Sequence, residues 1–153
     1  MKKILLTSFI FTLSFMLVGC GSKSKEEAFK EHNKNNNAVE CTAKDEKNEA
    51  TIYIYFDELD IVSSFDYFMK LNAEDVSRDD VKKARELICN GQGEFKKEWI
   101  EECSYELSGD YINAHVYINN GEWFDGNQTK KNILKKDNPY FSSYTCTEKN
   151  SEQ

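Results

Sequence analysis

The sequence is poor in the residues on which most catalytic sites depend. Among 153 residues it has only two histidines, His32 and His115, and its five cysteines form no Cys-x-x-C pair. Catalysis requires a nucleophile with a base, a set of metal ligands, or two carboxylates in a cleft. No spacing indicates a nucleophile with its base, and neither histidine lies at ligand spacing from a cysteine. We therefore expect no metal, no cofactor and no enzyme activity.

Basic residues are also scarce. The chain has 20 lysines and arginines against 27 aspartates and glutamates, which gives a formal net charge of −7 at pH 7. An acidic surface repels nucleic acid and gains nothing from an anionic membrane. The composition therefore argues against a nucleic-acid partner and against membrane attachment by charge.

Long apolar runs are absent except at residues 4–18, which follow Lys2 and Lys3. This run is shorter than the roughly 20 apolar residues that a membrane-spanning helix needs. A basic start followed by a short apolar run is typical of a secretory signal peptide. We therefore predict a signal peptide over residues 1–19.

The signal peptide ends in Leu17-Val18-Gly19-Cys20, which matches the lipobox of bacterial lipoproteins. In these proteins the cysteine thiol carries lipid and the cysteine becomes the new N-terminus. Each buried methylene of an acyl chain contributes about 0.8 kcal/mol, so two or three chains anchor a protein stably. We predict that Cys20 is lipidated and holds the protein at the cell membrane, facing the extracytoplasmic side.

The residues after Cys20 are polar. Residues 21–39 are rich in Lys, Asn, Glu and Ser, a composition that buries too little apolar surface to offset the entropy of ordering. We predict a tether over residues 20–39 in which His32 is solvated. A short helix at Lys25–Glu31 is an alternative within it, because this stretch contains good helix formers.

Four cysteines remain in the exported chain: Cys41, Cys89, Cys103 and Cys146. An even number outside the cytoplasm indicates two disulfides, for which three connectivities exist. Cys89 and Cys103 are close in sequence, whereas Cys41 and Cys146 lie near the two ends of the folded part. These positions favour the pairs Cys89–Cys103 and Cys41–Cys146.

Residues 40–147 have the length of one domain, followed by a disordered tail at 148–153. Alternation of apolar and polar residues predicts two β-hairpins, over Ala50–Leu71 and Glu102–Ile118. A helix follows Ser77 and stops at Asn90-Gly91. The remaining predicted elements are a strand at Val39–Lys44, a short helix within 127–136 and a closing strand at Tyr140–Thr147. We predict an α+β fold: a mostly antiparallel sheet with one main helix packed on it.

The alternation also assigns side chains to the two faces of this sheet. The inner face is predicted to hold Ile52, Ile54, Phe56, Ile112, Val116 and Ile118. The other face receives Tyr53, Tyr55, Tyr111 and Tyr117, with Trp123 in a nearby loop. Aromatic residues with a polar tip are enriched at interfaces, so these five residues form the predicted binding surface. Alternatively, the tyrosines pack across strands or beneath a second layer formed by residues 127–136.

Several features occur together here: the lipobox, a polar tether, an opening strand with Cys41-Thr42, a long hairpin, a helix ending in Cys89 and a hairpin containing Cys103. In combination they resemble the YehR-like family, small lipoproteins of low-GC bacteria with unknown function. The resemblance covers residues 40–147. It implies an extracytoplasmic lipoprotein with an α+β fold, and it implies no catalytic residue.

The sequence therefore predicts a non-enzymatic, membrane-anchored lipoprotein that binds an envelope protein or a cell-wall component. The alternative is a surface enzyme that acts on an envelope polymer through carboxylates such as Glu98, Glu101 or Glu102, although a solvated face explains these residues more simply. A third interpretation is a regulatory partner of another envelope protein. His115 is predicted to lie on the polar face of its strand, without an identifiable catalytic partner.

Overall fold

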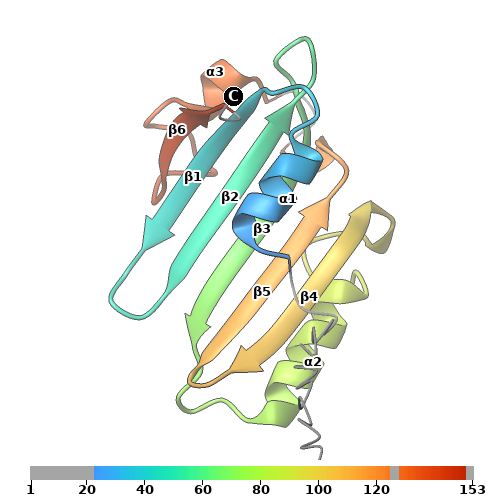
Figure 1. Ribbon diagram of the computed structural model, residues 1–153, viewed down its shortest axis with the longest axis vertical. Coiled ribbons are helices and arrows are strands. Elements are labelled where there is room, and N and C mark those ends of the chain that lie inside the picture. Colours follow the sequence, from blue (N-terminus) through green and yellow to red (C-terminus); the bar gives the residue numbers. More distant parts are fainter. Residues whose placement is uncertain (1–22, 125–127, 151–153) are drawn as a thin grey trace, which may run out of the picture.

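The computed structural model describes residues 23–124 and 128–150 (Figure 1). It contains a six-stranded antiparallel sheet with the strand order β4-β5-β3-β2-β1-β6. The strands are β1 (Ala38–Lys44), β2 (Glu49–Phe56), β3 (Val62–Asn72), β4 (Ile100–Ser108), β5 (Tyr111–Ile118) and β6 (Thr145–Lys149). The helices are α1 (Lys25–His32), α2 (Arg78–Cys89) and α3 (Lys130–Ile133), with 3-10 turns η1 (Lys97–Trp99) and η2 (Glu122–Phe124). The predicted α+β class, with its antiparallel sheet and two disulfides, is confirmed.

The predicted signal peptide and Cys20 lie outside the described residues. Within the ranges that the structure describes, no helix is long and apolar enough to cross a membrane.

Both predicted hairpins are confirmed. In the first, β2 pairs with β3 so that Ile54 lies opposite Phe65, and in the second β4 pairs with β5. The alternation of the sequence sends the predicted inner residues into one face, where all are buried: Ile52, Ile54, Phe56, Ile112, Val116 and Ile118. This face is covered by residues from the connections between strands and from the short elements η2 and α3, namely Phe95, Phe124, Ile133 and Phe141. We call it the apolar face.

Helix α2 lies beside β4 at one edge of the sheet (Figure 1). It begins after Ser77, whose Oγ accepts a hydrogen bond from the backbone N–H of Asp80 at 3.2 Å. Val81 is its one buried residue and belongs to a cluster with Tyr105 on the apolar face. The predicted stop is confirmed at Gly91, which has φ +71°, and a Cβ there would lie 2.3 Å from the backbone nitrogen of Lys97.

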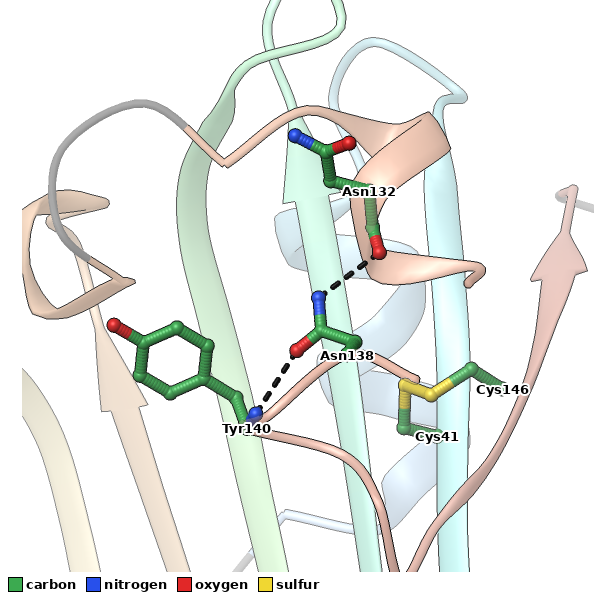
Figure 2. The surroundings of a disulfide bond; sticks show 5 residues. All are labelled: Cys41, Asn132, Asn138, Tyr140 and Cys146. Atoms are coloured by element: carbon green, nitrogen blue, oxygen red, sulfur yellow. Dashed lines mark hydrogen bonds between the residues drawn. A yellow bond between two sulfur atoms is a disulfide. The ribbon is translucent and has the colours of Figure 1, made fainter. Parts of the chain in front are cut away.

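The closing strand starts at Thr145, later than the predicted start at Tyr140. The reason is a turn stabilised by the side chain of Asn138 (Figure 2). Its amide donates to the carbonyl of Asn132 at 2.9 Å, and its carbonyl accepts the N–H of Tyr140 at 2.9 Å. Phe141 is thereby directed into the core instead of into a strand ladder. Strand β6 continues to Lys149, so the predicted tail at 148–153 is wrong for its first two residues.

The predicted tether is wrong from Lys23 onward. Residues 25–32 form α1, close to the short helix that was the alternative, and α1 crosses the face of the sheet opposite the apolar face (Figure 1). Its start has a complete capping box, in which Ser24 and Glu27 each bond the other's backbone N–H. Ala28 and Phe29 are buried against the sheet. The folded part therefore includes α1, which lies before the predicted domain start at residue 40.

Both predicted disulfides are present. Cys41–Cys146 joins β1 to the edge strand β6 (Figure 2), and Cys89–Cys103 joins the end of α2 to β4. Their sequence separations are 105 and 14 residues. The longer link closes nearly the whole domain and the shorter one fixes a single helix end.

Replacing both cysteines of a pair with alanine should destabilise the protein according to the length of the loop that is opened. In the chain-entropy model a loop of about 100 residues contributes about 4.7 kcal/mol and one of about 15 residues about 3 kcal/mol. Denaturant unfolding should show a larger loss for Cys41→Ala/Cys146→Ala than for Cys89→Ala/Cys103→Ala. The reverse order would contradict the role of the long link.

The docking of α1 predicts that Phe29→Ala lowers the free energy of unfolding by about 3 kcal/mol or more, as for other buried aromatic residues. The matched control is Lys30→Ala, which removes only an exposed ion pair to Glu26 and should cost about 0.5 kcal/mol or less. Denaturant unfolding measures both. Equal, small effects would mean that residues 25–32 behave as a tether after all.

Candidate functional site

The face beneath α1 contains a fully buried carboxylate, that of Asp66 in β3. Three side chains contact it. The hydroxyl of Tyr55 in β2 donates to Oδ2 at 2.6 Å. His32 Nδ1 lies 2.7 Å from Oδ2, and His115 Nε2 lies 2.6 Å from Oδ1. An ionised carboxylate can only accept, so both ring nitrogens carry the protons in these hydrogen bonds.

Strand register explains why these groups meet. Asp66 lies opposite Tyr53 in β2 and opposite Tyr117 in β5. Tyr55 and His115 are each two residues from one of these partners, so both point to the same face as Asp66 and reach it diagonally. His32 comes from the last turn of α1. The carboxylate thus connects two neighbouring strands and the helix that covers them.

The protonation of the cluster follows from its surroundings. Burial raises the pKa of Asp66, but the hydrogen bonds from His115, His32 and Tyr55 outweigh it, so this pKa lies below its usual range. Burial raises the pKa of Tyr55, and the negative charge of Asp66 raises it further. At neutral pH Asp66 is therefore ionised and Tyr55 keeps its proton.

Aromatic rings enclose the cluster. His32 stacks on Tyr117 with ring centroids 3.6 Å apart, and His115 stacks on Phe68 at 4.2 Å. Phe29 of α1 meets Tyr53 edge-on at 5.1 Å. The face is therefore a second, mixed aromatic and polar core.

This second core overturns the predicted binding surface. Tyr53, Tyr55 and Tyr117 do lie on the face opposite the apolar one, but α1 covers them and they are 3–5% exposed. Tyr111 is the first residue of β5 and is half-buried, with the ammonium of Lys70 4.5 Å from its ring centroid. Trp123 packs against Phe65 on the apolar face. The five residues form no common surface. A second layer does cover three of the tyrosines, but α1 forms it, so the alternative of a layer from residues 127–136 is wrong.

Three charged side chains surround the outer end of His32: Lys23, Glu31 and Glu102. The ammonium of Lys23 pairs with Glu31 at 2.7 Å and also with Glu102. Hydrogen bonds to Glu102 and Glu31 raise the pKa of Lys23 to about 12. His32 Nε2 lies 3.6 Å from Glu102 Oε1. We call Glu31, His32 and Glu102 the rim triad.

A β-bulge places Glu102 in the triad. The register of β4 against β5 shifts between Ile100, opposite Ile118, and Glu102, opposite Tyr117. Ile100 and Glu102 are two residues apart and in a regular strand would point to the same face. The bulge inserts one extra residue between their partners' positions and turns Glu102 to the side of His32. Glu102 is consequently half-buried and ion-paired, so the prediction that it belongs to a solvated face is wrong.

Catalytic geometry is incomplete at this cluster. Ser104 lies opposite His115 in the β4–β5 ladder, which suggests a serine, histidine and aspartate set with Asp66. The hydroxyl of Ser104 is buried and has no hydrogen-bond partner among the described residues. A nucleophile must reach its substrate, and this hydroxyl has no access.

The sequence contained a partial signal for this site. Alternation predicted that Tyr55 and His115 lie on the faces of their strands opposite the apolar residues, but it did not indicate that these strands flank β3 and Asp66. His32 was missed because the segment that carries it has only two apolar residues, Ala28 and Phe29, to indicate that it docks.

Comparison of the chain with protein-family models, curated protein sequences and solved structures finds no match. The resemblance to the YehR-like family stays a prediction from the sequence. What the protein does has to follow from its own residues and geometry.

The buried hydrogen bonds of Asp66 predict that Asp66→Asn lowers the free energy of unfolding by about 3 kcal/mol. The amide keeps the shape of the side chain but loses the charge, and its NH2 group replaces one of the two oxygens that accept a histidine N–H. The control Asp75→Asn changes an exposed aspartate and should stay within about 0.5 kcal/mol. Denaturant unfolding compares them, and similar effects would contradict a structural role for the Asp66 cluster.

Proposed function

We propose that this protein is a lipid-anchored, extracytoplasmic binding protein whose domain lies directly at the membrane surface. The lipobox at Cys20 supports the anchor. The two disulfides support export, because disulfides persist in oxidising compartments. The resemblance to YehR-like lipoproteins also supports export and a lipid anchor.

The attachment of Lys23 to the domain is the observation that carries the membrane-surface position. Lys23 is held on the domain by its ion pairs with Glu31 and Glu102. Lys23 is the third residue after Cys20, and three residues span at most about 11 Å when extended. The lipid therefore keeps the α1 side of the domain close to the bilayer. A partner must accordingly be an envelope protein or a cell-wall component that comes to this surface.

The use of the polar side chains supports binding over catalysis. The carboxylate of Asp66 is occupied by Tyr55, His32 and His115, and all four side chains are buried. These groups hold α1 on the sheet. In this arrangement their role is to stabilise a binding scaffold.

Lipidation is tested at Cys20. Cys20→Ser should abolish metabolic labelling with palmitate and leave the protein unprocessed or released from the membrane fraction. The control Ser22→Ala leaves the lipobox intact and should label normally. Retained palmitate and membrane association in Cys20→Ser would refute the anchor.

A further inference from the structure

The rim triad has the spacing of a metal site. His32 Nε2 and one carboxylate oxygen each from Glu31 and Glu102 lie within 4.8 Å of one another. Zinc binds nitrogen and oxygen ligands at about 2.0–2.2 Å, so neighbouring ligands in a tetrahedral site are about 3.4 Å apart. The 3.6 Å between His32 Nε2 and Glu102 Oε1 already matches this distance. Glu31 is exposed and precedes His32 in α1, so rotation of its side chain can bring a third ligand atom to the same distance.

His32 is oriented as a ligand by its buried side. Its side chain is 5% exposed, and its Nδ1 bonds Asp66, so Nε2 is the ring nitrogen that lies on the side of the carboxylates. Nε2 makes no hydrogen bond within the described part of the chain. A carboxylate behind the other ring nitrogen is the arrangement that fixes metal-binding histidines. Here His115 and Tyr55 fix that carboxylate in turn.

The ammonium of Lys23 already pairs with both carboxylates of the triad. Glu31 and Glu102 therefore hold a positive charge in the protein as it stands. Lys23 is only 33% exposed, but it comes from the chain segment before α1 and can leave without disturbing a helix or strand. A metal ion would compete with it for the same oxygens.

We propose that Glu31, His32 and Glu102 bind a divalent transition-metal ion of the zinc class, in exchange for the ammonium of Lys23. One imidazole nitrogen with two carboxylates favours such an ion over Ca²⁺ and Mg²⁺, which prefer oxygen ligands. The proposal goes beyond lipid anchoring and does not depend on it. It gives the membrane-proximal side of α1 a ligand.

Titration calorimetry of the full lipidated chain in detergent, stripped of metal with EDTA, tests the proposal with Zn²⁺. We expect one Zn²⁺ per chain and at least tenfold weaker binding of Ca²⁺. Glu102→Gln and Glu31→Gln should each weaken Zn²⁺ binding at least tenfold. The matched control is Glu106→Gln, an exposed residue of the same strand β4, which should bind as the parent does.

Lys23→Met separates a metal site from a structural ion cluster. It should tighten Zn²⁺ binding at least tenfold, because the competing ammonium is gone, whereas a structural role for Lys23 predicts no gain. X-ray absorption of the zinc complex should show nitrogen and oxygen ligands with one imidazole and no sulfur. His32→Gln should remove the imidazole signal, and its thermal unfolding reports whether it folds. Absence of Zn²⁺ binding, equal binding by Glu102→Gln, or no gain in Zn²⁺ binding by Lys23→Met would overturn the proposal.

Discussion

The hydrogen bonds to the buried carboxylate of Asp66 are the interaction on which the rest of the structure depends. A buried charge without partners is costly, so this side chain requires donors from every side. They come from β2, β5 and α1, through Tyr55, His115 and His32. Displacing α1 would remove one donor and expose the aromatic rings around it. The helix is therefore part of the fold although only Ala28 and Phe29 contribute apolar burial.

The sheet is consequently buried on both faces by different chemistry. The apolar face is covered by α2, by short helical turns and by loops, whereas the other face packs tyrosines, histidines and Asp66 beneath α1. The second face also sets the place of the domain in the cell envelope under the proposed anchor. Lys23, the third residue after Cys20, is already ion-paired to the domain beside His32.

The sequence was sufficient for the elements whose signals are local. Alternation predicted both hairpins and the inward residues of β2 and β5, and Ser77 and Gly91 marked the ends of α2. The positions of the cysteines also favoured the correct pairs: Cys89 and Cys103 are close in sequence, and Cys41 and Cys146 lie near the two ends of the folded part. The burial of Asp66 could not be predicted, because it depends on partners from elements far apart in the chain. The docking of α1 could not be predicted for the same reason. The start of β6 was predicted too early because the residues before Thr145 form the turn stabilised by Asn138 and not a strand.

The protonation of the two histidine rings is the most direct test of this account. An ionised Asp66 requires the proton of His32 on Nδ1 and that of His115 on Nε2, since these atoms face its oxygens. Long-range proton–nitrogen NMR correlation of the metal-free protein at neutral pH distinguishes the ring nitrogens. The account predicts a protonated Nδ1 in His32 and a protonated Nε2 in His115, both protected from solvent exchange. A His32 ring protonated only on Nε2 would contradict it.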